Sequence, residues 1–201
     1  MILTRRSFLT ASIATLLATP ARAQATKPQW VIGIIPDKPF DIGLIDMNLV
    51  PLEYQRQVVP YSGTEPVGSI VVDAAKRHLY FVLMGAKALR FGIAVGREGA
   101  SWHGTAVVGR KAKWPSWTPT ANMRRKNPQL PIRMAGGPKN PLGARALYLF
   151  KDGVDTLYRI HGTNEPSSIG KSASSGCIRM FNENVFELFA EVPVGTTVVV
   201  R

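Results

Sequence analysis

Short apolar runs bounded by polar turns dominate the chain after residue 67. These runs are rich in Val, Ile, Leu, Tyr and Phe, a composition and length typical of β-strands. Six of them predict strands, at residues 69–73, 78–83, 89–95, 145–150, 156–161 and 196–200. The first three form a predicted β-meander, the next two are joined by a hairpin-like Lys-Asp-Gly turn, and the nearly all-Val last run predicts a buried strand.

The remaining segments differ from this pattern. Residues 182–192 carry apolar residues with helical spacing, with Asn182 as candidate N-cap and a Pro after the last turn, which predicts one short helix. Residues 102–143 contain six prolines among basic residues and tryptophans, so we expect no long element there but an ordered lid or groove wall. Residues 24–66, broken by prolines, predict an extended arm with one strand near 55–61.

Composition agrees with one mainly β domain with short helices. The chain has 201 residues, of which 45% are hydrophobic, and Gly and Pro together number 33. This excludes a disordered chain, and the single cysteine excludes an internal disulfide. The net charge of +12 is compatible with nucleic acid, an anionic membrane or an anionic polymer as partner.

The N-terminus reduces these alternatives. Arg5 and Arg6 precede an uncharged stretch of 15 residues, too short to span a bilayer, and Ala-Arg-Ala at 21–23 is a candidate cleavage site. Residues 1–23 therefore resemble a twin-arginine (Tat) export signal, with an uncleaved membrane tether as the alternative. Cleavage removes three arginines and no acid, leaving about +9. A periplasmic location discounts nucleic acid and favours a wall polymer.

The lone Cys177 needs an explanation in an oxidising compartment. It is either a buried inert residue or a nucleophile, and a nucleophilic thiol needs a base. His78 begins a strand-like run and is expected at the surface, whereas His103 is expected to line a groove or to be solvated. His161 ends a predicted strand and precedes Cys177 by 16 residues, which makes a Cys–His acyl-transfer site plausible. A glycine directly before the cysteine would expose backbone N–H groups to an acyl oxygen.

Two motifs carry a resemblance to a known family. The sequence His-Gly-Thr-Asn at 161–164, followed by Ser-Ser-Gly-Cys-Ile-Arg-Met at 174–180, resembles the signature of the L,D-transpeptidase catalytic domain (YkuD type; ErfK/YbiS/YcfS/YnhG group). The likeness includes Gly-Arg-Glu-Gly at 96–99 and the Trp-Pro-Ser-Trp-Thr-Pro and Gly-Gly-Pro-Lys-Asn-Pro-Leu-Gly segments. It implies a β-sandwich with a Cys-bearing loop and one helix near the C-terminus, as a catalytic domain over residues 67–201.

The resemblance also implies roles for individual residues. Cys177 would be the nucleophile and His161 its base, with Gly162 orienting the histidine through the main chain. Backbone groups at Ser175 and Gly176 would support the oxyanion, although many members carry His where this chain has Ser175. We expect the substrate to be bound by Arg179, Tyr158, Asn164, Trp114 and Trp117.

The implied reaction cross-links diaminopimelate residues of peptidoglycan stem peptides through a Cys thioester, without a cofactor. The acyl acceptor stays open: water would make an L,D-carboxypeptidase or cross-link hydrolase, and a lipoprotein lysine an outer-membrane anchoring enzyme. A non-catalytic wall-binding module is the non-enzymatic alternative. Metal binding by Cys177 and His161 lacks further ligands at suitable spacing, and no integral membrane segment is expected after signal cleavage.

The export signal gives a first prediction. The exported protein should begin at Gln24, because the small-x-small site ends at Ala23. N-terminal sequencing of protein recovered from the periplasm measures this, and a start before Gln24 would contradict cleavage at this site.

Overall fold

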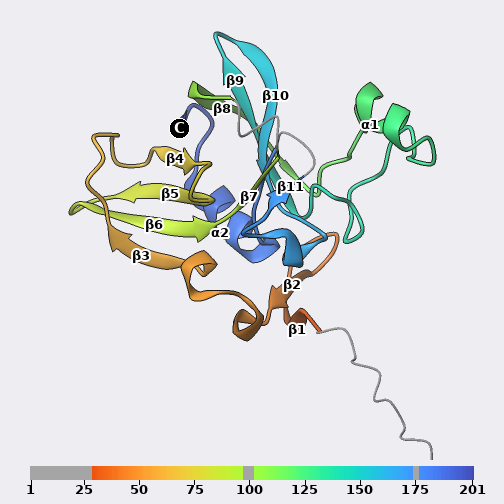
Figure 1. The fold of residues 1–201 in the computed structure, drawn as a ribbon, viewed down its shortest axis with the longest axis horizontal. Helices are drawn as coiled ribbons and strands as arrows, with labels where there is room; N and C mark the ends of the chain where they lie inside the picture. The colour runs from red at the N-terminus through yellow and green to blue at the C-terminus, as the bar shows by residue number, and fades with distance from the viewer. Residues whose placement is uncertain (1–28, 97–101, 174–176) are drawn as a thin grey trace, which may run out of the picture.

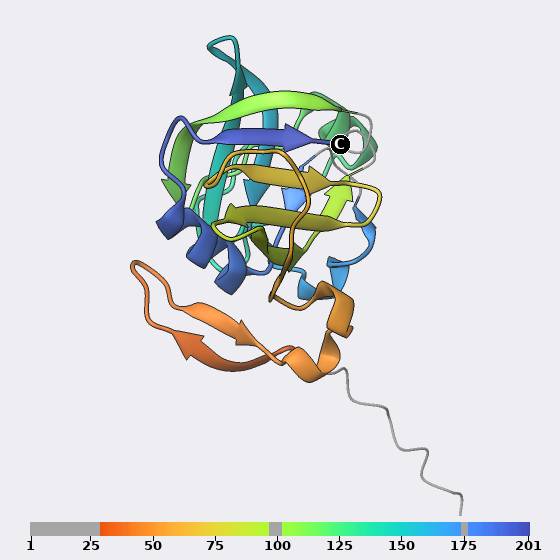
Figure 2. The same ribbon diagram turned by 90° about the vertical axis from the view of Figure 1, so that its left-hand side faces the viewer.

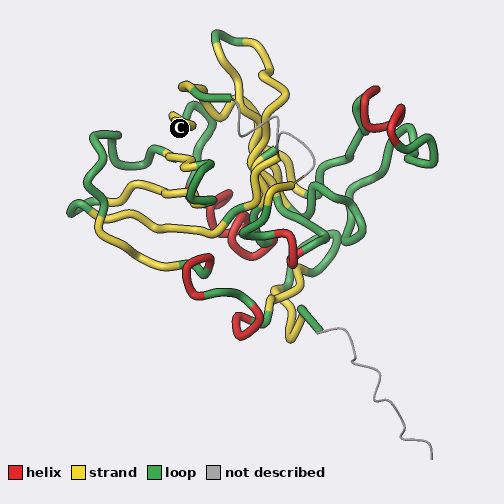
Figure 3. Tube along the Cα trace, in the orientation of Figure 1, coloured by secondary structure: helices red, strands yellow, loops and turns green. Residues whose placement is uncertain are grey.

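The computed structural model describes residues 29–96, 102–173 and 177–201, and most of them form strands (Figure 1). The described helices are short (Figure 3). The α-helices are α1 (Ala121–Lys126) and α2 (Asn182–Glu191), and the 3-10 turns are η1 (Met47–Leu49), η2 (Leu52–Tyr54) and η3 (Pro166–Ser168). The prediction of a mainly β domain with few helices is confirmed.

One large mixed sheet forms the body of the protein. Its strands are β3 (Gln57–Pro60), β4 (Ile70–Asp73), β5 (His78–Leu83), β6 (Lys87–Gly92), β7 (Ala94–Gly96), β8 (Gly104–Lys113), β9 (Arg145–Lys151), β10 (Val154–His161), β11 (Ser172–Ala173), β12 (Ile178–Arg179) and β13 (Thr197–Val200). Their spatial order is β11-β7-β12-β10-β9-β8-β13-β4-β5-β6-β3. The β4–β6 part and the β9–β10 part run in different directions and share one apolar core (Figure 1).

The β-meander is confirmed by the antiparallel ladders β4–β5 and β5–β6. The third predicted run, however, divides into β6 and β7 at Ile93. The Ile93 N–H donates to the Arg77 carbonyl (2.9 Å), and its own carbonyl accepts the Gly170 N–H (3.0 Å). After β6 the chain therefore stops pairing with β5 and continues as β7, which pairs with β12.

The prediction that residues 102–143 lack a long element is wrong for β8, a strand of ten residues. The prolines of this stretch begin only at Pro115, so they do not interrupt Gly104–Lys113. β8 pairs with β9 and β13, which places it near the centre of the sheet. After β8 the chain follows the irregular path that the prolines predict, and its helix α1 has only six residues.

Helix α2 buries Val185 and Leu188 against the sheet, as the helical spacing predicts. Its N-cap is Phe181, so the expectation that Asn182 is the N-cap is wrong, and Asn182 is instead the first helical residue. At the other end, Lys111 Nζ donates to the carbonyl oxygens of Phe189 and Val192, both at 2.6 Å. These bonds satisfy carbonyls that a helix end leaves without intrahelical donors.

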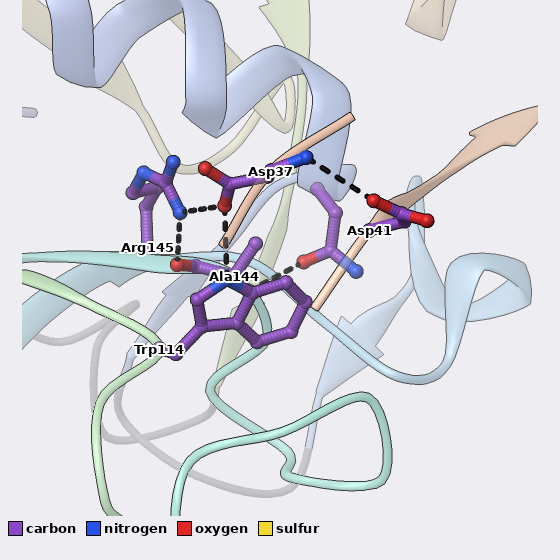
Figure 4. Close-up of polar contacts among 6 residues, drawn as sticks. Asp37, Asp41, Trp114, Ala144 and Arg145 are labelled. Carbon is purple, nitrogen blue, oxygen red and sulfur yellow. Dashed lines mark hydrogen bonds and ion pairs between the residues drawn. The ribbon is translucent and has the colours of Figure 1, made fainter. Parts of the chain in front are cut away.

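The described part of the predicted arm, residues 29–66, contains the predicted strand, β3, and also a hairpin that the sequence pattern did not indicate. This hairpin pairs β1 (Val31–Ile35) with β2 (Ile42–Ile45) and lies against α2 (Figure 2). The Ile45 N–H donates to Glu183 Oε2 at 2.9 Å. The turn of the hairpin carries Asp37, whose carboxylate Oδ2 lies 2.7 Å from Arg145 Nη1 and accepts from the Trp114 indole at 2.9 Å (Figure 4).

This contact joins two nearly buried charges, since the side chains of Arg145 and Asp37 are 2% and 10% exposed. The hydrogen bond from Arg145 holds the pKa of Asp37 below its ordinary value of 3.8. Arg145 also donates to the Ala144 carbonyl at 2.8 Å and lies over the ring of Phe186, 4.9 Å from its centroid. The hairpin is therefore attached at its turn by a charge pair rather than by apolar contacts alone.

Within the residues that the structure describes, no helix is both long and apolar enough to cross a membrane.

The buried pair predicts a large effect of Asp37→Ala on stability. Removing the carboxylate leaves Arg145 as an uncompensated buried charge, so the free energy of unfolding should fall by about 3 kcal/mol in urea titrations near neutral pH. A folded-state pKa below 3.8 means that the carboxylate stabilises the fold above this pH, and that the benefit is lost as pH falls through the folded pKa. The difference from wild type should therefore shrink in acid.

Asp41→Ala is the matched control, because Asp41 is exposed in the same turn, where its carboxylate accepts the Asp37 N–H at 3.3 Å and forms no ion pair with any residue that the structure describes. Its effect should stay within about 0.5 kcal/mol. Equal effects of the two substitutions would contradict a dominant charge pair.

Candidate active site

Two neighbouring parallel strands position the candidate cysteine and histidine. β10 and β12 pair with Ile160 opposite Ile178 and His161 opposite Arg179, and the Met180 N–H donates to the His161 carbonyl at 2.8 Å. Cys177 directly precedes β12, and its carbonyl accepts the Gly96 N–H at 3.2 Å. Because side chains alternate along a strand, both isoleucines point into the core, whereas Cys177, His161 and Arg179 share the opposite face.

The ring of His161 is held in one tautomer. Its side chain is 2% exposed, and Nδ1 lies 2.5 Å from the Gly162 carbonyl oxygen. A carbonyl only accepts, so Nδ1 carries the proton and Nε2 has a lone pair ready to accept one. Burial lowers the pKa of His161 to about 3, and the positive charges of Arg179 and Arg159 act in the same direction. The ring is therefore neutral at physiological pH.

Asn182, at the start of α2, supports the turn that follows His161. Its Oδ1 accepts from the N–H groups of Ala144 (3.0 Å) and Thr163 (3.1 Å), and its Nδ2 donates to the Thr163 carbonyl at 2.8 Å. A Cβ at Gly162 would collide with Asn182 Oδ1, so glycine is required for this close approach. The Gly162 N–H also donates to the Arg145 carbonyl at 3.0 Å.

Cys177 and His161 line a cleft of about 1430 Å³. One wall is formed by residues of the strands β8, β9 and β10. The other wall is formed by residues between 114 and 142, including α1. On this second wall, Trp117 exchanges two 2.8 Å backbone hydrogen bonds with Met134, and Trp114 is 8% exposed. Trp114 packs edge-on against Phe40, with the two ring centroids 5.2 Å apart. Its indole also donates a hydrogen bond to Asp37 (Figure 4). The arm thus reaches the cleft wall through Trp114.

The structure brings most of the predicted site residues together. Those that line the cleft are Cys177, His161, Arg179, Tyr158, Trp114 and Trp117. Asn164 does not join them, because it is exposed and donates to the Lys139 carbonyl at 3.0 Å. The expected oxyanion residues Ser175 and Gly176 lie outside the described residues.

The other two histidines are not in the cleft. His103 is exposed. The expectation that His78 lies at the surface is wrong: it is 8% exposed, with Nε2 2.9 Å from the Glu53 carbonyl. The η2 turn covers His78 at the start of β5. This contact joins segments distant in sequence, so the local composition of a strand does not predict it.

Sequence reasoning missed part of the cleft, namely Arg110 on β8, Tyr148 on β9 and Arg159 on β10. Arg159 could have been found, because it precedes His161 by two positions in one strand and so shares its face. Arg110 and Tyr148 could not have been found in this way, because placing them in the cleft depends on the pairing of β8 with β9. The strand β8 was not predicted.

Charge in the cleft is mainly positive. Arg179 Nη1 lies 3.3 Å from Glu165 Oε2, and Arg179 Nε has no hydrogen-bond partner among the residues described. In that same part of the chain, no group of three or more His, Cys, Asp or Glu side chains is placed to hold a metal ion. The chemistry that these residues offer is a thiol and a neutral imidazole on one face of a cationic cleft of peptide size.

Comparison with known proteins agrees with this class of site. The sequence profile of the L,D-transpeptidase catalytic domain (YkuD) matches residues 68–200. The chain belongs to this family.

Named relatives support the assignment. In Escherichia coli K12, the probable L,D-transpeptidases ErfK/SrfK and YbiS are 39% and 40% identical to it over 138 residues, which are 64% of this chain and 42% and 43% of theirs. The chain therefore spans less than half the length of these curated relatives.

Solved structures share the fold. A Brucella melitensis crystal structure, named a probable carnitine operon oxidoreductase caia, is 44% identical, with a TM-score of 0.52 over 78% of this chain and 99% of its own. An Enterococcus faecium L,D-transpeptidase with a cysteine-to-serine substitution is 20% identical, with a TM-score of 0.50 over 68% of this chain and 50% of its own.

The burial of His161 gives a pH prediction. Its imidazole Cε1 chemical shift should stay constant from about pH 8 to about pH 5, whereas the urea-unfolded protein should titrate near the ordinary value of about 6.5. Between that value and the folded pKa, the unfolded chain binds a proton that the folded one does not. Stability should therefore fall with decreasing pH, by up to about 1.4 kcal/mol per pH unit from this group. A folded-state midpoint between 6 and 7 would contradict the neutral, buried ring.

Proposed function

We propose that the protein is a peptidoglycan L,D-transpeptidase in which Cys177 is the nucleophile and His161 the general base. The observation that carries this proposal is the pairing of β10 with β12, which puts Cys177 on the same face of neighbouring strands as His161, a histidine whose Nε2 is an acceptor. Family membership supplies the reaction class. Activity, substrate and partners are inferred for this chain because it matches only part of its longer relatives.

The first step forms an acyl-enzyme. The Cys177 thiol gives its proton to His161 Nε2 as the sulfur attacks the carbonyl carbon between diaminopimelate and the terminal D-Ala of a tetrapeptide stem. The tetrahedral oxyanion is held by backbone N–H groups around Ser175, Gly176 and Cys177. Its collapse breaks the peptide bond, the imidazolium returns the proton to the departing amine, and D-Ala leaves a thioester behind.

The second step transfers the acyl group. The side-chain amine of a second diaminopimelate attacks the thioester, His161 accepts the amine proton, and the C–S bond breaks. The proton on His161 then restores the Cys177 thiol. Because the buried ring resists a positive charge, the resting state is a neutral thiol and imidazole, and the base acts at the moment of attack.

The size of the cleft favours a peptide acceptor over water. At about 1430 Å³ it exceeds the roughly 300–1,000 Å³ of ordinary small-molecule sites, as the simultaneous binding of two stems requires. Hydrolysis, which would make an L,D-carboxypeptidase, needs no such second space. A lysine of an outer-membrane lipoprotein remains the alternative acceptor, and a wall-binding module the non-enzymatic one.

We further propose that the protein works in the periplasm after Tat export, with residues 24–66 as an arm on a catalytic domain of residues 67–201. The twin arginines near the N-terminus and the positive charge of the exported part support this location.

Product analysis tests the proposed reaction. Purified protein incubated with a disaccharide-tetrapeptide should yield D-Ala and a cross-linked dimer detectable by mass spectrometry. Trimmed monomer without dimer would show that the protein acts as a carboxypeptidase instead of a transferase. A muropeptide joined to an added lipoprotein peptide, formed without any stem–stem dimer, would indicate the anchoring enzyme.

Cys177→Ala distinguishes a catalytic cysteine from a structural one. It should lower dimer formation by at least about a thousandfold, because no other group supplies the nucleophile. Its free energy of unfolding should stay within about 1 kcal/mol of wild type, since Cys177 is only partly buried. Retained activity, or a large loss of stability, would favour a structural cysteine.

A further inference from the structure

Three adjacent strands place two arginines on either side of one tyrosine in the cleft. The ladders pair Arg110 of β8 with Tyr148 of β9, and Tyr148 with Arg159 of β10, so the three side chains form a row on one face. The guanidinium carbons lie 3.5 Å (Arg110) and 4.7 Å (Arg159) from the Tyr148 ring centroid. All three residues line the cleft. We call this row the Arg-Tyr-Arg row.

The row leaves hydrogen-bond donors facing the cleft. Tyr148 is 5% exposed, so its ring is a fixed plate that holds the guanidinium groups by cation–π contact. Arg159 is partly engaged by Asp155 at 3.2 Å. Arg110 is exposed, and none of the ion pairs formed by residues 29–96, 102–173 and 177–201 involves it. Two like charges around one ring repel each other, and a bound carboxylate would relieve this repulsion.

The same row ends at the candidate nucleophile. Cys177 precedes Ile178, whose partner is Ile160, so Cys177 lies beside Arg159. Neighbouring strands are about 4.8 Å apart, which puts the Tyr148 backbone at about 10 Å and the Arg110 backbone at about 14 Å from that of Cys177. Since the Arg110 guanidinium lies over the Tyr148 ring, its donors are on the order of 10 Å from the cysteine.

We propose that the Arg-Tyr-Arg row is a carboxylate-binding subsite that holds the donor stem by the free α-carboxylate of the residue before diaminopimelate. This inference rests on the proposed function. In the stem, that residue is a D-Glu linked through its side chain, and its α-carboxylate lies roughly 8–9 Å from the attacked carbonyl in an extended chain. The carboxylate of the terminal D-Ala lies only about 4 Å from that carbonyl, too near to reach Arg110.

Two tetrapeptides that differ only at this carboxylate test the subsite, one with the free acid and one with the primary amide. D-Ala release is measured, because it reports acylation by the donor alone. Wild type should prefer the acid by about tenfold in kcat/KM, mainly through KM, as expected for a charge-assisted hydrogen bond at a partly exposed site.

Arg110→Gln should lower kcat/KM for the acid about tenfold more than kcat/KM for the amide, so that the preference disappears. Arg110→Lys should retain part of the preference, because it keeps the charge and loses the planar fork. Lys151→Gln is the matched control: it removes one exposed positive charge from the end of β9, away from the cleft-lining residues, and should behave as wild type. Thermal melting of each variant checks the fold.

The possible results are distinct. Equal use of acid and amide by wild type, or an Arg110→Gln effect of the same size on both peptides, would overturn the subsite while leaving the proposed function intact. Failure of wild type to release D-Ala from either peptide would overturn the proposed function, and the subsite with it.

Discussion

The parallel pairing of β10 with β12 is the constraint on which the candidate site depends. β12 contains only two residues, yet it is held on both sides, by β10 in parallel and by β7 in antiparallel orientation. Parallel neighbours need a long connection, and the chain between His161 and Cys177 supplies it. The register then decides which side chains share the cleft face. A shift by one residue would turn the thiol into the core and an isoleucine toward the substrate.

Rigid supports behind the cleft keep His161 neutral and in one orientation. The imidazole of His161 is held by the backbone carbonyl of Gly162, the next residue in the chain. The turn that follows is held by the side-chain amide of Asn182 at the start of α2. Such an arrangement excludes water from the ring, which lowers its pKa while defining a single acceptor nitrogen. A neutral, buried imidazole of this kind has little affinity for a proton at rest.

Sequence patterns were sufficient where the information is local. Short β-rich runs bounded by turn residues located the meander and the hairpin strands, and one cysteine with a histidine before a glycine indicated the chemistry. The patterns failed where contacts are distant: the ten-residue β8 was obscured by prolines that begin only after it, and the β1–β2 hairpin consists of short runs that pack on α2. Asn182 was expected to cap its own helix, yet its amide serves a turn 19 residues earlier, which no local rule indicates.

The contact of Asp37 with Trp114 has a consequence for how such a protein can diversify. Asp37 lies some thirty residues before the segment that matches the family profile, yet it binds an aromatic residue in the cleft wall. The shape of the cleft is therefore set in part by chain outside the shared domain. Changes in the arm can alter substrate fit while every residue around the thiol stays the same, so this segment is a separate route by which selectivity can evolve.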